Sequence, residues 1–357
     1  VAVPLEIKAG EKRVALVPDI INKLTRLGYE VVIQSGAGDN SQGSDAAYTA
    51  AGATVVNGDV LAGADVVLSV QPLTPAQMAT LKSGAITISF LSTVTAVDSI
   101  DAAIKAGVTA FSLELVPRIS RAQSMDALTS QALCAGYRAV LVGAEMSPRF
   151  FPLLMTAAGT VTPAQVLVLG VGVAGLQAIA TARRLGAVVS AYDVRPSSAD
   201  EVKSMGATFI ELELESLEGT GGYAREMTAE RAAQQRELLK PYIEKADVVI
   251  TTAAVPGRKA PVLVTSDMLD VMKSGSVVVD LASETGGNVE GSSAGAAIRP
   301  RSPRKSTPAF SPSRKIPTVG SPASPSAVQA WPTEATTWPA PWARRRRSST
   351  PSAMPWA

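Results

Sequence analysis

The chain has 357 residues, a formal net charge of +2, one cysteine and no histidine. This length fits two domains that each bury a core, and the single Cys134 excludes an internal disulfide, which fits a reducing compartment. Because histidine is the commonest acid/base residue and metal ligand, its absence leads us to expect no zinc or transition-metal site. The first sixteen residues carry charges too early for a signal peptide and lack its apolar run.

Short β-rich runs alternate with helical patterns through the first half of the chain, as is typical of parallel α/β folds. The expected strands are Val1–Ile7, Tyr29–Gln34, Asp65–Val70, Ala85–Phe90 and Val108–Leu115. The expected helices are Pro18–Leu27, Thr74–Lys82 and Ala96–Lys105, with Gly28, Gly84 and Gly107 close behind them as helix-ending residues. These repeated units predict one doubly wound domain over residues 1–130.

The second half of the chain repeats the alternation after a stretch rich in Ala and Leu. We expect residues 127–158 to be mostly helical and residues 131–160 to link the domains. The strands expected next are Gln165–Leu169, Ala187–Asp193, Ala207–Leu214, Asp247–Thr252 and Ser276–Leu281, and the helices are Val173–Leu185 and Met227–Lys245. Residues 161–291 are therefore predicted to form a second doubly wound, Rossmann-like domain.

Residues 150–182 carry no charge, which is long enough to suggest a membrane helix. Pro152, Pro163 and three glycines interrupt the stretch. We interpret it as a buried strand, a glycine-rich turn and a helix.

Composition changes abruptly at Gly291. Residues 1–291 hold 23 Lys and Arg against 30 Asp and Glu, whereas residues 292–357 hold 10 against one, Glu334. The tail also contains all four Trp, 12 of the 24 Pro and no Leu. Because it cannot form an apolar face, we expect it to be disordered.

The run Arg344–Arg347 could be interpreted as a nucleic-acid patch. We favour an out-of-frame reading, because Pro, Ala, Arg, Ser, Thr and Gly are what GC-rich codons give out of frame. Codons for Trp331–Trp338, read two bases further on, permit Ala-Tyr-Gly-Ser-Asn-Asn-Leu, an ordinary globular sequence. We therefore assign residues 292–357 no function and expect no nucleic-acid partner.

Gly170, Gly172 and Gly175 form a G-x-G-x-x-G pattern. Alone, it is equally a glycine turn of some other α/β fold, but here it follows the apolar run Val166–Leu169 and opens a helix, as in dinucleotide-binding domains. In such a motif the first glycine permits a tight turn, the second lets the backbone approach the pyrophosphate, and the third lets helix and strand pack closely. The helix N-terminus, with Val173 in its first turn, then faces the anion.

Asp193 ends the next expected strand, 18 residues after Gly175. A carboxylate there accepts hydrogen bonds from the adenosine ribose and repels a 2′-phosphate, so it favours NAD(H) over NADP(H). Arg195 complicates this prediction, because a nearby arginine can accommodate that phosphate. We give Asp193 more weight because of its place at the strand end.

A polar loop, Pro117–Gln131, follows an expected strand and precedes an apolar helix. Asp126 and Thr129 could simply cap that helix. Capping does not explain Arg118 and Gln123. Because ligands of open α/β sheets bind beyond the carboxyl ends of strands, this loop is a candidate binding site.

Five segments together make the chain resemble the soluble NAD(H)-binding component of the proton-translocating transhydrogenase family. They are RISRAQSMDALTSQA, GVGVAGLQAIATA, YDVRP, GGYAREM and DLASETGGNVEG, and the resemblance runs over residues 1–291. It implies that Arg118, Gln123 and Asp126 reach the nicotinamide, with Thr129 where the family usually has Ser. It also implies that Tyr223 closes over the cofactor from a loop whose glycines could equally make it a plain linker. The remaining cofactor contacts that we expect are Ala174, Val194 and Ala254.

The resemblance further implies direct, Re/Si-specific hydride transfer from NADH to NADP⁺, with no side chain acting as acid or base. This chain has one dinucleotide motif, so NADP(H) and the proton channel are expected on membrane-spanning partner subunits. We expect a homodimer in the cytoplasm, peripheral on the inner face of the cell membrane.

Two other interpretations remain. Alanine dehydrogenase shares the fold and a start like Glu11–Ala15, but that family carries a catalytic Lys and His; this chain has no His, and Leu68–Pro72 lacks the expected lysine. Saccharopine dehydrogenase is more distant. A non-catalytic NAD(H)-binding pseudo-subunit is the second alternative, suggested by the unusual tail.

Overall fold

A computed structural model describes residues 1–93, 96–117, 119–214, 228–254 and 259–293. Two of the predicted site residues, Arg118 and Tyr223, lie outside these ranges, as does the tail from residue 294 onward. Among the residues described, no helix combines the length and hydropathy that crossing a bilayer requires.

The N-terminal domain contains a six-stranded sheet in the order β3-β2-β1-β4-β5-β6, and all its pairings are parallel. Its strands are β1 (Ala2–Val3), β2 (Val32–Gln34), β3 (Thr54–Val56), β4 (Val66–Leu68), β5 (Ile86–Ser89) and β6 (Thr109–Ser112). Its helices are α1 (Pro18–Arg26), α2 (Asp45–Ala50), α3 (Pro75–Ala79) and α4 (Val97–Ala106). The order reverses between β1 and β4, which makes their carboxyl ends a topological switch point.

Alternation along the strands divides this domain into two apolar layers. Val3 and Ile33 pack with Ile21 of α1 and Tyr48 of α2 on one side. Ala2 and Val67 pack with Met78 of α3 and Ala103 of α4 on the other. Local signals set the helix ends: α3 begins with a capping box of Thr74 and Gln77, and α4 ends at Gly107 in the left-handed region.

The C-terminal domain contains a five-stranded parallel sheet in the order β11-β10-β9-β12-β13. Its strands are β9 (Gln165–Leu169), β10 (Val188–Tyr192), β11 (Thr208–Phe209), β12 (Val248–Thr251) and β13 (Val277–Asp280). Its helices are α6 (Val173–Arg184), α7 (Ser198–Ser204), α8 (Ala229–Lys245) and α9 (Ser266–Asp270). Leu169 pairs with both Tyr192 and Thr251, so the three central strands end side by side.

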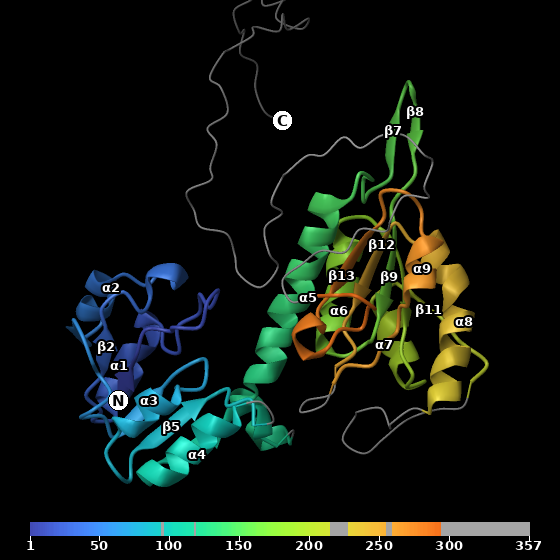
Figure 1. Cartoon of the computed structure of the whole chain (residues 1–357). Coiled ribbons are helices and arrows are strands. Elements are labelled where there is room, and N and C mark those ends of the chain that lie inside the picture. The colour runs from blue at the N-terminus through green and yellow to red at the C-terminus, as the bar shows by residue number, and fades with distance from the viewer. Residues whose placement is uncertain (94–95, 118, 215–227, 255–258, 294–357) are drawn as a thin grey trace, which may run out of the picture. The chain divides into compact units, whose positions relative to one another are not determined.

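Helices cover both faces of this sheet, so its strands are largely apolar (Figure 1). Val166 and Val168 face α6 and the helix α5 (Ala127–Met146), whereas Leu167 and Leu169 face α8. The prediction of two parallel α/β domains is therefore confirmed.

The prediction that residues 127–158 are mostly helical is wrong in its second half. Helix α5 ends at Met146, and an antiparallel hairpin follows, β7 (Leu154–Thr156) with β8 (Gly159–Val161). Pro148 and Pro152 stop the helix, and Gly159 has a φ of 144°, which suits a tight turn.

Several short elements were not predicted: α2, β3, α7 and α9. The strand expected at Ala207–Leu214 is only Thr208–Phe209, and the first strand is only Ala2–Val3. Such short elements form because neighbouring strands and helices hold them, which a local pattern does not contain.

Candidate functional site

The glycine turn between β9 and α6 has the geometry that its three glycines predict. Gly170 has a φ of 98°, and a Cβ there would lie 2.7 Å from Thr252 Oγ1. A Cβ on Gly175 would lie 2.0 Å from the carbonyl oxygen of Gly170. The first and third glycines are therefore required by the turn itself.

Gly172 is different, because a Cβ there would meet no heavy atom within 4 Å. It is exposed and precedes the first turn of α6, which contains Val173, Ala174 and Gly175. Amide groups at a helix start lack intrahelical partners and attract anions. The open space over Gly172 thus fits the approach of a pyrophosphate.

The carboxylate of Asp193 lies directly beside this turn. Its Oδ2 accepts a hydrogen bond of 2.7 Å from the backbone N–H of Val171. Its Oδ1 accepts bonds of 2.9 Å from the backbone N–H and from Nε of Arg195. Val194, between them, is partly buried against the core. The predicted ribose ligand and the predicted complication, Arg195, thus form an ion pair.

The third strand end of the site comes from β12. Thr252 Oγ1 donates to the carbonyl of Gly170 at 3.0 Å, which joins the β9 and β12 ends at the topological switch point of this sheet. Ala254, predicted to contact the cofactor, follows in the same loop and is exposed.

Two residues that the sequence did not single out support this loop. Asn288 is completely buried, and its Nδ2 donates to the carbonyls of Ala253 at 2.7 Å and Pro261 at 2.8 Å. Asp280, at the end of β13, accepts from Asn288 N at 2.9 Å and from Thr251 Oγ1 at 3.0 Å. A buried Asn after the pair Gly286-Gly287 was the available signal.

The polar loop of the N-terminal domain leads straight into α5. Asp126 caps that helix, because its Oδ1 accepts from Thr129 N at 2.9 Å and its Oδ2 from Thr129 Oγ1 at 2.6 Å. Gln123 is exposed in the short 3-10 helix Ser120–Met125. The structure therefore brings Asp126 and Thr129 together.

A charged network ties the start of α5 to the loop after β1. Arg13 donates to both carboxylate oxygens of Glu11, at 2.7 and 2.6 Å, and to Gln131 Oε1 of α5 at 2.9 Å. Burial alone would raise the pKa of the Glu11 carboxyl, but hydrogen bonds from Arg13 and Gln71 lower that pKa to about 2. Sequence patterns did not predict this network.

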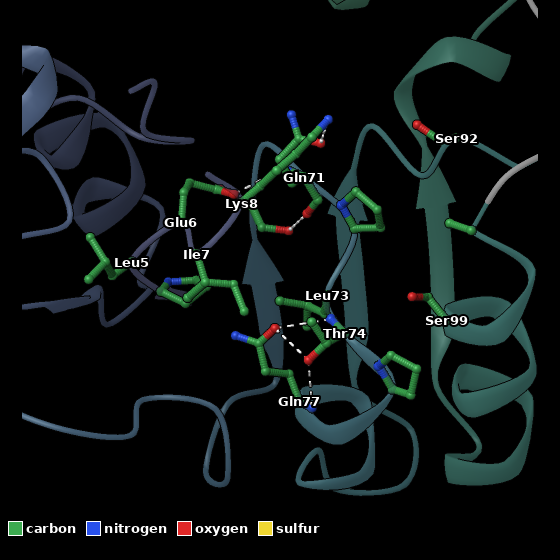
Figure 2. A pocket seen from close by; sticks show the side chains of 15 residues that line it. Leu5, Glu6, Ile7, Lys8, Gln71, Leu73, Thr74, Gln77, Ser92 and Ser99 are labelled. Atoms are coloured by element: carbon green, nitrogen blue, oxygen red, sulfur yellow. Dashed lines mark hydrogen bonds between the residues drawn. The ribbon is translucent and has the colours of Figure 1, made fainter. Parts of the chain in front are cut away.

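A cavity of about 460 Å³ lies at the switch point of the N-terminal sheet (Figure 2). Residues after β1, such as Glu6 and Lys8, meet Gln71 after β4 and Ser92 after β5. Burial raises the pKa of the Glu6 carboxyl, which accepts from the backbone N–H groups of Val70 and Gln71. The site residues predicted from the sequence are not among its lining residues.

A glycine turn that opens a helix, with a carboxylate at the end of the next parallel strand, defines a dinucleotide-binding domain of the Rossmann type. Two family models match the chain: "Alanine dehydrogenase/PNT, N-terminal domain" over residues 2–135 and "Alanine dehydrogenase/PNT, C-terminal domain" over residues 139–303. The chain belongs to the alanine dehydrogenase/PNT family. The second match continues past Gly291, where we expected the resemblance to end.

Relatives within the family divide by similarity. The chain is 50% identical over 298 residues to an NAD(P) transhydrogenase subunit alpha chain of Rhodospirillum rubrum, covering 81% of this chain and 78% of the relative. It is 35% identical over 297 residues to alanine dehydrogenase of Mycobacterium tuberculosis, covering 82% and 74%. The solved transhydrogenase structure from Sinorhizobium meliloti has a TM-score of 0.74 at 46% identity, covering 83% of this chain and 82% of that one.

Proposed function

We propose that this chain is the NAD(H)-binding subunit of a proton-translocating NAD(P)⁺ transhydrogenase. The observation that carries the proposal is the Asp193 carboxylate on the Val171 N–H, beside the open Gly172, in a chain 50% identical to a transhydrogenase alpha subunit. A carboxylate at this strand end suits a ribose with two free hydroxyls, and so NAD(H).

In this proposal the turn and the strand ends hold the cofactor. The first turn of α6 receives the pyrophosphate over Gly172, Asp193 accepts from the adenosine ribose, and Val194 and Ala254 flank the adenosine. Thr252 and Asn288 keep the β12 loop in place for this contact.

The bound dinucleotide supplies the hydride, so the protein needs no acid or base for the transfer. Arg118, Gln123 and Asp126 orient the nicotinamide end through charged and polar hydrogen bonds, with Thr129 fixing the Asp126 carboxylate. Tyr223 closes over the site and helps to exclude water. Their task is positioning, which can supply several orders of magnitude in rate.

Membrane-spanning and NADP(H)-binding partner subunits complete the enzyme in this proposal. The Rhodospirillum rubrum relative is named as a portion of a subunit alpha, which supports an assembly of several chains. The chain would then lie in the cytoplasm, bound peripherally to the inner face of the cell membrane.

A homodimer is supported by the hairpin β7–β8. All its strand positions are exposed, and the exposed fraction of Met155 is 76%, with Phe150 at 59% close by. A two-stranded hairpin is marginal in water by itself, and exposed strand edges invite pairing. A second copy of this chain is the occupant that we propose, and Met155→Asp should shift light-scattering mass from dimer toward monomer.

Alanine dehydrogenase activity is the competing assignment, since the family and the fold are shared. That reaction needs side chains that move protons. At the cavity of the N-terminal sheet, Gln71 donates to Glu11 at 2.6 Å and accepts from Lys8 at 3.4 Å, and the whole chain has no histidine. This composition supports a site without acid/base catalysis.

The test is an NADH titration of the full chain by fluorescence, followed by a hydride-transfer assay. We expect saturable NADH binding and transfer to an NADP⁺ analogue once the purified membrane-spanning and NADP(H)-binding subunits are added. Alanine-dependent reduction of NAD⁺ by the chain alone would instead establish alanine dehydrogenase. NADH binding without transfer in the reconstituted complex would identify a non-catalytic pseudo-subunit.

A further inference from the structure

We propose that Arg195 is a placeholder for the ribose diol: its guanidinium occupies the Asp193 carboxylate until NADH replaces it, and Asp193 thereby withholds Arg195 from a 2′-phosphate. The inference rests on the proposed NAD(H) site and gives Arg195 a role in selecting the cofactor. It turns the apparent contradiction of an NAD-type aspartate beside an NADP-type arginine into one device.

The contacts of the pair carry the argument. Asp193 Oδ1 accepts from the backbone N–H and from Nε of Arg195, both at 2.9 Å. Its Oδ2 accepts from Val171 N at 2.7 Å and from Nη2 of Arg195 at 3.1 Å. Nη2 also donates to the Val171 carbonyl at 3.2 Å. The exposed fractions of the two side chains are 19% for Arg195 and 8% for Asp193.

A carboxylate offers about four acceptor positions, and these four donors fill them. A ribose diol that donates two hydrogen bonds to Asp193 must therefore displace two donors. The backbone N–H groups of Val171 and Arg195 are held by the glycine turn and the chain, whereas the guanidinium can swing away on its flexible side chain. NADH binding consequently exchanges the guanidinium for the diol.

A 2′-phosphate changes this balance. It cannot donate to Asp193 and is repelled by the carboxylate, so the guanidinium stays paired with Asp193 and is not offered to the phosphate. Asn at position 193 removes the charge, while its amide oxygen can still accept from Val171 N–H. Since Arg binds phosphate through planar, charge-assisted bonds, the released guanidinium should then recruit NADPH.

The experiment titrates NADH and NADPH into the full chain for wild type, Asp193→Asn, Arg195→Ala and the double variant. Asp193→Asn should bind NADPH at least about tenfold more tightly than wild type, the size expected of a charged hydrogen bond. The double variant should lose that gain. Arg195→Ala alone should bind NADH as tightly as wild type or a few-fold more tightly, because the competitor for Asp193 is gone.

Two results would overturn the proposal: an NADPH gain that persists in the double variant, or an NADH affinity that falls more than threefold in Arg195→Ala. Circular dichroism checks folding, and Asp193→Ser repeats the test if the Asn variant unfolds. The matched control is the ion pair of Lys240 in α8 and Asp267 in α9, whose Ala and Asn variants should change neither affinity. Wild type that binds no NADH would overturn the proposed function too, whereas failure of the variants alone overturns only the placeholder.

Discussion

Gly136 of α5 lies so close to Ala174 of α6 that a Cβ at position 136 would stand 2.1 Å from the Ala174 carbonyl oxygen. The contact joins the helix that follows the polar loop to the first turn of the dinucleotide motif. Because the obstacle is backbone rather than a flexible side chain, the two helices can approach only at a glycine.

Gly136→Ala should therefore disturb both the packing of α5 and the glycine turn. We expect a loss of about 1–3 kcal/mol in the free energy of unfolding, the usual cost of overpacking, and weaker NADH binding. Denaturant unfolding and fluorescence titration measure the two effects. Gly63→Ala is the matched control, because a Cβ there meets nothing within 4 Å. An equal effect of both variants would contradict the close contact.

Gly172→Ala and Gly175→Ala should separate cofactor binding from folding. The added Cβ at Gly172 meets no atom of the chain, so the melting temperature should stay the same while NADH affinity falls. The added Cβ at Gly175 meets the Gly170 carbonyl oxygen at 2.0 Å, so both stability and affinity should fall. Calorimetry and titration on the same samples decide this. Unchanged NADH affinity in Gly172→Ala would place the pyrophosphate elsewhere.

Asp126→Ala should reduce hydride transfer far more than NADH affinity, because the adenosine end is held by Gly172 and Asp193. Arg118→Ala should show the same division. Loss of the Asp126 cap should also lower stability by about 1 kcal/mol. The transfer rate in the reconstituted complex is compared with the NADH dissociation constant. Thr129→Ala is the milder control, since the Thr129 N–H still binds Asp126 at 2.9 Å. Parallel losses of rate and affinity would exclude this division of labour.

Glu11→Gln should destabilise the protein near neutral pH but not in acid. The pKa of Glu11 is about 2 in the folded protein against an ordinary value of 4.5, so its charge stabilises the fold above pH 4.5. That contribution is lost as the pH falls from 4.5 toward 2. We expect about 1–2 kcal/mol at pH 7, discounted for the exposed Arg13 partner. The measurement is the difference in unfolding free energy between wild type and variant across this range.

The exposed Glu244 of α8 provides the control, since its Gln variant should show no such trend. A Glu11→Gln difference that stays constant between pH 7 and pH 3 would contradict the lowered pKa.

Local patterns predicted the centre of the site well. The spacing of Gly170, Gly172 and Gly175 and the place of Asp193 depend on one strand, one turn and one helix, which adjacent residues encode. The pairing of Asp193 with Arg195 is also local, but its geometry depends on the Val171 backbone. Sequence patterns therefore identified both residues and not their relationship.

Residues far apart in the chain were missed. Asn288 reaches Ala253 across 35 positions, and Arg13 reaches Gln131 across 118. No periodicity links such pairs, because the sheet order brings them together. The β7–β8 hairpin was missed because its Ala- and Leu-rich surroundings outweighed Pro148 and Pro152 in our prediction.

Helix α5 is one uninterrupted rod of 20 residues, and its close contact at Gly136 lies nine residues from its first residue. At 1.5 Å per residue, the contact acts as a fulcrum about 13 Å from the amino end. A tilt of about 5° there would carry Asp126 by roughly 1 Å, a displacement large enough to change a hydride-transfer rate by orders of magnitude. Any partner that leans on this lever would therefore control the chemistry without touching the dinucleotide.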